Sequence, residues 1–425
     1  MKSLDSRWIV CQIGAREHYA IPRAFHETGQ LSALITDAWM PRDSPLRNLP
    51  LITRLRDRWH EELAEATVVA PTTRMLAFEA ASKLLKRDPW STITHRNRLF
   101  QKEAIRRLPT ILSQPDTPTT LFSYSYAALE LFREAKRRGW QTVLGQIDPG
   151  PREDALVQRL RAQHPEWQES SERAPLPGYW ESWREECSLA DRILVNSEWS
   201  RTLLIEEGVA PSKIEIIPLA LGKPPVSPSA SSTDPNAPPT LPLKLLFLGQ
   251  AILRKGIHDL VEVARTLDPE TWRVEVVGPH GRLPDNLPPS IHFHGSVPRS
   301  EAREWYANAD LFVLPTHSDG FALTQLEAMS HGLPVIATPC CGEVVKEGVN
   351  GWLIPSGDPQ ALSDRLRRIQ ENPALLIPLR EGARETVAAF GLRHVGQALT
   401  SPREPNRRAP AFDSSRKPEP DSSTP

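Results

Sequence analysis

Short apolar runs alternate with longer amphipathic stretches along most of the chain, and this pattern predicts an α/β fold. In the first part of the chain the predicted strands are residues 8–13, 31–36, 120–123, 142–146, 192–196 and 214–218. In the second part they are 244–248, 273–277, 291–293, 311–314, 335–337 and 351–354. Several of these runs, such as 311–314 (LFVL), are continuously apolar, which is typical of strands covered by helices on both faces. The repeated strand–helix–strand order therefore predicts parallel sheets with right-handed crossovers.

Proline marks the boundaries between these regions. The chain has 42 prolines in 425 residues, about twice the usual frequency. Residues 223–242 hold seven of them and almost no large apolar side chain, so this segment is predicted to be an extended linker. The tail, 401–425, has the same character and is expected to be disordered. Two doubly wound blocks, 1–222 and 243–400, would then enclose a cleft at the carboxyl ends of their strands.

Charge and cysteine content exclude several classes of protein. Lys and Arg number 51 against 52 Asp and Glu, so the chain lacks the basic excess that a nucleic-acid partner would require. Four cysteines without a Cys-x-x-Cys pair argue against a disulfide scaffold, a zinc ribbon or a thioredoxin-type redox pair. No apolar run is long enough for a signal peptide or a membrane span, so a cytoplasmic protein is expected.

Residues 315–332 (PTHSDGFALTQLEAMSHG) carry the most informative chemistry. Here a buried strand is followed by a polar loop and a helix, which we expect to begin near Phe321 with Asp319 as its N-cap. The backbone amides from Gly320 to Leu323 would then face the cleft and could bind an anion. Asp319 and Glu327 would bracket this helix start, an arrangement that suits a nucleotide diphosphate sugar. The alternative is that Asp319 only caps the helix and Glu327 is a solvated helix residue.

Two glycine loops follow predicted strands. After strand 244–248 comes 249–256 (GQAILRKG), where Arg254 and Lys255 could bind a diphosphate, although such a loop is more often an ordinary turn. It lacks the spacing and the Ser or Thr of a P-loop. After strand 8–13, Gly14 permits a sharp turn and Ala15 is small enough to keep a ligand close. No further glycines complete a dinucleotide-binding fingerprint, so by itself this second loop indicates only a turn.

Taken in order with residues 189–221, these elements resemble the family 4 glycosyltransferases, retaining enzymes with the two-domain GT-B fold. The similar segments are ADRILVNSEWS within 189–221, Gly249…Lys255-Gly256, Asp319 with seven residues to Glu327, and the strand from Gly332 to Thr338. The resemblance implies an N-terminal Rossmann-like acceptor domain (1–222), the linker (223–242) and a C-terminal Rossmann-like donor domain (243–380). It also implies that a last helix within 381–400 crosses back to the first domain.

The resemblance also implies roles for individual residues. Glu327 would accept hydrogen bonds from the ribose, and Lys255 would bind the diphosphate. Asp319 would lie beside the transferred sugar. Phosphate and sugar would contact the backbone at Gly320, Phe321, Ala322 and Leu323, while Gly14, Ala15, Gln250, Arg254 and Gly256 would complete the donor site. Asp148 is a further catalytic candidate toward the acceptor; alternatively it is a turn residue ahead of Pro149.

The implied function is transfer of a hexose-type sugar from a nucleotide diphosphate donor to an acceptor hydroxyl with retention of configuration. The chain contains no Asp-x-Asp, the usual carboxylate clamp for a divalent ion, so metal-independent transfer without a cofactor is predicted. Gln250 stands where the family usually has an arginine, and Ile147 where many members have a histidine. Two alternatives therefore stay open: a sugar-nucleotide epimerase on the same fold, or a degenerate scaffold that binds sugar nucleotides without turnover.

Residues 42–107 suggest a weak peripheral contact with an anionic membrane. The segment holds 14 basic and 8 acidic residues, interleaved with Trp59, Phe78, Trp90 and Phe100. Basic and aromatic side chains together can dock on lipid headgroups. The alternative is a solvated helical face with its aromatic side chains buried. The oligomeric state is not predicted by any of these features.

Overall fold

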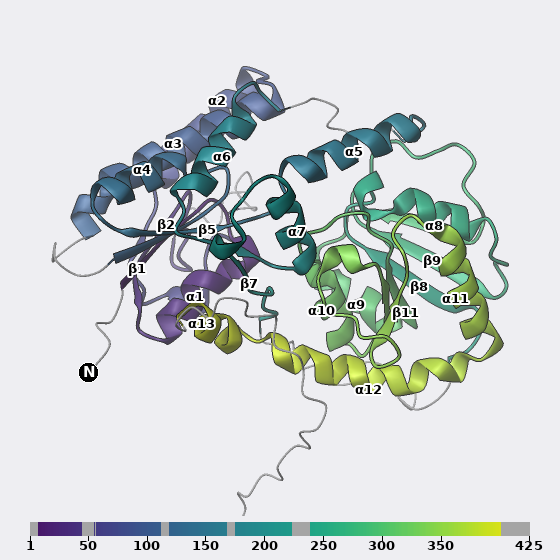
Figure 1. Ribbon diagram of the computed structural model, residues 1–425. Helices are drawn as coiled ribbons and strands as arrows, with labels where there is room; N and C mark the ends of the chain where they lie inside the picture. The colour runs from purple at the N-terminus through teal and green to yellow at the C-terminus, as the bar shows by residue number, and fades with distance from the viewer. Residues whose placement is uncertain are drawn as a thin grey trace, which may run out of the picture.

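The computed structural model describes residues 7–44, 55, 57–111, 119–167, 175–222 and 239–400. Most of the predicted linker, and all of the tail at 401–425, lie outside the described residues. So does part of the basic segment, at 45–54 and 56. Figure 1 shows two α/β domains side by side, as the apolar pattern predicted.

The first domain is built on a parallel sheet of seven strands in the order β3-β2-β1-β4-β5-β6-β7. Its strands are β1 (Arg7–Gln12), β2 (Leu31–Thr36), β3 (Val68–Val69), β4 (Thr119–Tyr124), β5 (Gln141–Gly145), β6 (Arg192–Val195) and β7 (Ile214–Ile216). All the strands predicted here are present, with small shifts at their ends. Sequence analysis missed β3, because two half-buried residues at a sheet edge leave no apolar run to detect.

Alternate side chains of these strands enter two separate cores. In β1, Ile9 and Cys11 pack on the face covered by α3, α4 and α6, whereas Trp8 and Val10 pack on the face covered by α1. Burial on both faces explains why these strands are continuously apolar. The helices of this part of the chain are α1 (Ala20–Glu27), α2 (Thr72–Leu84), α3 (Pro89–Ile111), α4 (Leu129–Arg137), α5 (Pro151–Gln163), α6 (Tyr179–Leu189) and α7 (Glu198–Glu206).

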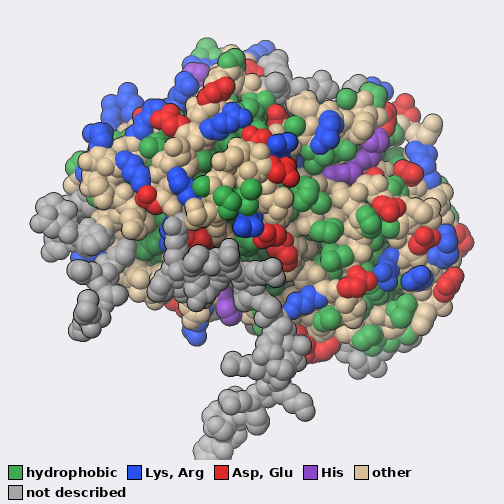
Figure 2. Space-filling model, viewed as in Figure 1, with side chains coloured by type: hydrophobic (Ala, Val, Ile, Leu, Met, Phe, Trp, Pro, Cys, Tyr) green, Lys and Arg blue, Asp and Glu red, His purple; other side chains and the backbone are tan. Residues whose placement is uncertain are grey.

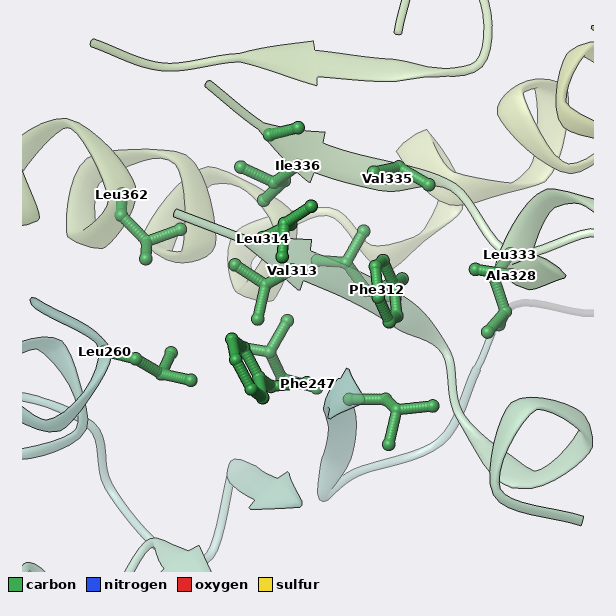
Figure 3. Packing of buried hydrophobic residues seen from close by; sticks show 14 of the residues in the cluster. Phe247, Leu260, Phe312, Val313, Leu314, Ala328, Leu333, Val335, Ile336 and Leu362 are labelled. Carbon is green, nitrogen blue, oxygen red and sulfur yellow. The ribbon is translucent and has the colours of Figure 1, made fainter. Parts of the chain in front are cut away.

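The second domain has a parallel sheet of six strands in the order β10-β9-β8-β11-β12-β13. Its strands are β8 (Leu243–Leu248), β9 (Trp272–Val277), β10 (Ile291–Gly295), β11 (Leu311–Leu314), β12 (Val335–Ala337) and β13 (Gly351–Leu353). Figure 3 shows Phe247, Phe312 and Ile336 from this sheet packed among Leu260 and Leu362 of the covering helices. The helices are α8 (Ile257–Ala264), α9 (Arg299–Asn308), α10 (Leu323–Ser330), α11 (Pro359–Glu371), α12 (Leu376–Val387) and α13 (Leu392–Thr400).

Single 3₁₀ turns complete the described secondary structure. They are η1 (Arg16–Tyr19), η4 (Glu61–Leu63), η5 (Pro211–Lys213), η6 (Leu253–Lys255), η7 (Pro339–Cys341), η8 (Pro373–Leu375) and η9 (Ala388–Phe390). Two of them, η1 and η6, directly follow the strands β1 and β8. They therefore lie where ligands of open α/β sheets bind.

The C-terminal helices return to the first domain, as Figure 1 shows. The last helix expected within 381–400 is present as α13, but it does not fill that range: α12 ends at Val387, η9 follows, and extended backbone at Gly391 separates them from α13. Val395 and Leu399 of α13 lie in the core beside α1. A Cβ added to Gly396 would lie 3.5 Å from the Cβ of Ala24, an ordinary van der Waals distance, so α13 lies directly against α1 at this point.

Helix α5 connects the domains in the opposite direction. By sequence it belongs to the first block, yet Leu160 and the following Trp167 lie in the core of the second domain. Figure 1 shows this helix extending from the first domain over the second. Side chains at the start of α5 are therefore carried to the junction between the domains.

The four cysteines, Cys11, Cys187, Cys340 and Cys341, are buried and free. They form no disulfide framework, in agreement with the expectation from their spacing. Within the described ranges, every helix is too short or too polar to span a lipid bilayer.

Candidate functional site

A cluster of charged side chains lies at the carboxyl end of β8, where the two domains meet. The Lys255 Nζ is 3.0 Å from an Asp319 carboxylate oxygen, and the Arg254 guanidinium is 3.8 Å from the other oxygen. Burial alone would raise the pKa of Asp319, but the two cations outweigh it and hold that pKa below its ordinary value. The structure thus brings Arg254 and Lys255 together with Asp319, which follows Lys255 by 64 positions in the sequence.

Glycine is required for this cluster to form. Gly256 has a φ of +72°, and a Cβ built there would lie 1.9 Å from the carbonyl oxygen of Pro315. Any larger residue would push the η6 loop away from the end of β11. Close contact of these two loops is what places Lys255 against Asp319.

Glu153 joins the cluster from the first domain, and sequence analysis missed it. Its Oε2 accepts a 2.5 Å hydrogen bond from the Ser318 hydroxyl and lies 3.5 Å from the Arg254 guanidinium. Burial raises the pKa of Glu153 to about 7, although the charge of Arg254 opposes the shift. Its position at the start of α5, just past the carboxyl end of β5, was the available signal, because ligand-binding groups gather at that edge.

Asp148 lies across the domain junction from the same loop. It accepts hydrogen bonds from the Tyr126 hydroxyl at 2.5 Å and from the Gly150 amide at 2.9 Å. Burial raises the pKa of Asp148, against the effect of these hydrogen bonds. Gly320 is its neighbour: a Cβ added there would be 3.3 Å from the Ile147 carbonyl and 4.0 Å from the Asp148 Cα. Asp148 therefore holds its own turn, as the alternative had it, and also faces the second domain.

The helix start at 319–323 differs from the expectation. Helix α10 begins at Leu323 with Ala322 as N-cap, so Asp319 is not the cap and helix formation at Phe321 was predicted too early. The reason is that the preceding backbone is bonded elsewhere: the Asp319 amide donates to the Cys340 carbonyl and the Ala322 amide to the Cys341 carbonyl. The Ala322 amide is thus occupied and does not face a ligand.

The other residues predicted in the second domain are spread around this loop. Glu327, on α10, accepts a 2.9 Å hydrogen bond from the Tyr306 hydroxyl, which orients its carboxylate.

Phe321 is buried and lines a separate cavity of about 270 Å³, together with Phe390 and the connection after β7. Gln250 is exposed just after β8. Arg254 donates a 2.6 Å hydrogen bond to the Ser318 carbonyl.

The Gly14 loop of the first domain is held by an ion pair. The Gly14 amide donates to Asp37 at 2.8 Å, and Arg58 lies 2.9 Å from the same carboxylate. Ala15 follows, half-buried, ahead of η1. Within η1, Glu17, His18 and Tyr19 all have positive φ, between 49° and 61°. Three consecutive strained residues of this kind are typical of functional loops.

Arg16, in this loop, is a cation that sequence analysis missed. Its guanidinium lies 5.4 Å from the centre of the Tyr124 ring, and its charge lowers the pKa of Asp148. The strained loop and the turn at Asp148 are therefore close in space. Burial raises the pKa of the neighbouring Glu17 to about 7, against the charge of Arg16.

The basic segment at 42–107 offers less to a membrane than its composition suggested. Phe100 is fully buried in the core, so its proposed contact with lipid is wrong. The side chain of Glu103 is only 2% exposed and pairs with Arg74, Arg106 and Arg107. Three of the basic residues thus neutralise a buried carboxylate.

Comparisons with known proteins relate the second domain to one family of enzymes. Residues 242–372, the second domain, match the family model described as Glycosyl transferases group 1. Over 173 residues the chain is 28% identical to the amylovoran biosynthesis glycosyltransferase AmsK of Erwinia amylovora, covering 36% of this chain and 42% of that protein. The chain thus spans about two fifths of the length of this curated relative.

Solved structures are similar over nearly the whole chain. Sucrose-phosphate synthase from Thermosynechococcus elongatus has a TM-score of 0.63 at 18% identity, covering 92% of this chain and 97% of that one. Anabaena Alr3699/HepE in complex with UDP has a TM-score of 0.59 at 14% identity, covering 92% and 98%. At such low identity the likeness concerns the fold, and it confirms the GT-B architecture.

Proposed function

We propose that this chain is a retaining glycosyltransferase that moves a hexose-type sugar from a nucleotide diphosphate donor to an acceptor hydroxyl. The group 1 domain, the GT-B fold and the relative in amylovoran biosynthesis support transfer of a sugar, in the synthesis of a carbohydrate or polysaccharide. The similar HepE structure is a complex with UDP, which supports a nucleotide donor. The observation that carries the proposal is the pairing of Lys255 with Asp319 at the domain junction.

Lys255 and Arg254 would stabilise the leaving diphosphate. The Lys255 ammonium now lies 3.0 Å from Asp319, so an arriving diphosphate would find a cation already placed at the end of β8. Cations fixed where negative charge develops lower the barrier to its departure. Arg16 and the Gly14 loop would approach the same diphosphate from the first domain, and no divalent ion would be needed.

The remaining groups would position donor and acceptor. Glu327, oriented by Tyr306, would accept hydrogen bonds from the ribose hydroxyls. Asp319 would lie beside the sugar. Asp148 would contact the acceptor from the first domain. Close approach of Gly320 to Ile147 would exclude water from the reacting centre.

Release of nucleoside diphosphate from a panel of UDP-, GDP- and ADP-sugars, with candidate acceptors and without added Mg²⁺ or Mn²⁺, tests the proposal. We expect Lys255→Ala to lower kcat/KM by roughly 100- to 1,000-fold. Glu327→Ala should raise the donor KM by about 10-fold or more, because a charged hydrogen-bond acceptor is lost. Lys136→Ala is the matched control, since Lys136 pairs with Asp191 at 2.6 Å at the end of α4, ahead of the first residue of β5 rather than beyond its carboxyl end.

Three outcomes would contradict the proposal. Unchanged turnover in both Lys255→Ala and Glu327→Ala would refute the assignment of these residues to the donor site. Isomerised donor without release would identify an epimerase. Binding of sugar nucleotides without any conversion would identify a degenerate scaffold.

A further inference from the structure

A second cluster of polar side chains lies outside the residues assigned to the donor site. His258 and Asp259 occupy the first turn of α8, and His317 comes from the loop after β11. One nitrogen or oxygen atom from each lies within 4.8 Å of the others. The two oxygens of Asp259 each face one imidazole: His317 Nε2 is 2.7 Å from Oδ2, and His258 Nε2 is 3.5 Å from Oδ1.

The imidazole of His258 is poorly satisfied by the protein itself. Its side chain is only 7% exposed, its Nδ1 has no hydrogen-bond partner, and its Nε2 contact is long for a hydrogen bond. Leaving a buried polar group without partners costs about 1–3 kcal/mol. His258 Nε2, the atom that faces Asp259, has only this long contact and could therefore bind a ligand shared with Asp259.

We propose that His258, Asp259 and His317 bind a divalent transition-metal ion of the Zn²⁺ class. Two imidazoles and one carboxylate are donor groups that zinc prefers, with bonds of about 2.0–2.1 Å. Tetrahedral coordination at that length places ligand atoms about 3.4 Å apart. The contact of His258 with Asp259 already has this separation, at 3.5 Å. The contact of His317 with Asp259, now 2.7 Å, would lengthen as the ion replaces the shared proton.

The three side chains of the cluster keep small exposed fractions, 7% for His258, 9% for Asp259 and 12% for His317. Figure 2 shows histidine side chains gathered in one surface patch where α5 lies over the second domain. The ring of His164, the residue after α5, has its centre 4.2 Å from that of His258. The fourth coordination position would be left to water.

The bound ion would brace the loops of the neighbouring charged cluster. The His317 amide donates a 2.8 Å hydrogen bond to the Arg254 carbonyl, and Asp319 follows two residues later. The ion would not take part in sugar transfer, since none of its three ligands is assigned to donor or acceptor. The proposal therefore stands independently of the proposed function.

Metal binding to the untagged full chain tests this inference. After treatment with a chelator and dialysis, titration calorimetry with Zn²⁺ and elemental analysis should show one ion per chain at micromolar affinity or tighter. His258→Gln and His317→Asn should each weaken binding by at least 10-fold. His294→Gln is the matched control, because His294 also contacts a carboxylate, Glu275 at 2.5 Å, outside the cluster. It should bind Zn²⁺ as the wild type does.

A spectroscopic measurement on the wild type covers the case in which a variant fails to fold. Co²⁺ should give the visible absorption of a tetrahedral site with nitrogen and oxygen ligands, and Zn²⁺ should abolish it. No stoichiometric binding, or an equal loss of affinity in the control variant, would overturn the proposal. So would a Co²⁺ spectrum no different from that of the aqueous ion.

Discussion

Replacing Glu153 by Gln should change how the stability of this protein depends on pH. The native pKa of Glu153 is raised to about 7, from an ordinary value of 4.5, because burial at the domain junction disfavours its charged form. Between these two values the folded chain holds a proton that the unfolded chain has lost. The free energy of unfolding therefore falls as the pH rises through this range. This destabilisation by Glu153 is absent below its pKa in the unfolded chain and complete above its pKa in the folded chain.

The size of the effect follows from the two pKa values. A raised pKa of about 7 against 4.5 corresponds to a destabilisation of about 3 kcal/mol once both states are ionised. From pH 5 to pH 8 the wild type should lose most of this through Glu153. Glutamine keeps the acceptor for the Ser318 hydroxyl but cannot ionise, so E153Q should lack this loss.

Urea unfolding of wild type and E153Q at pH 5 and pH 8 measures the difference. Tryptophan fluorescence and circular dichroism should give coincident transitions before one free energy is assigned. Glu371→Gln, at the exposed end of α11, is the control and should follow the wild type at both pH values. A pH-dependent difference between wild type and E153Q below about 0.5 kcal/mol, or of opposite sign, would refute the reasoning.

Two further predictions concern the loops and the surface. Gly256→Ala should destabilise the chain by about 2 kcal/mol more than Gly29→Ala, as measured by denaturant unfolding. Both glycines have a φ near +70°, but only at Gly256 would the new Cβ meet a carbonyl oxygen, at 1.9 Å; equal losses would contradict this explanation. Vesicles containing anionic lipid should not pellet the chain at physiological salt, because three arginines of the basic segment neutralise Glu103. Pelleting that increases with anionic lipid content would instead support the peripheral membrane contact.

The sequence by itself determined the fold of this protein. Runs such as Leu311–Leu314 are apolar at every position because both faces of the strand are buried. Such a run can be recognised in the sequence without knowing which elements pack against it. The approximate place of Lys255 and Asp319 also follows from local pattern, since each lies just after a predicted strand. The same reasoning failed for β3, where two residues at a sheet edge are held by pairing with β2 rather than by their own pattern.

Only the tertiary structure decided which side chains meet. Glu153 is remote in sequence from Arg254 and Ser318, and it reaches them because α5 crosses to the second domain. Aspartate is a residue type that commonly caps helices, and Asp319 stands just before one. The amides of Asp319 and Ala322 instead donate hydrogen bonds to carbonyls of η7, so the helix begins only at Leu323. Hydrophobic periodicity reports burial one element at a time, whereas hydrogen bonds and ion pairs between elements depend on positions that packing alone sets.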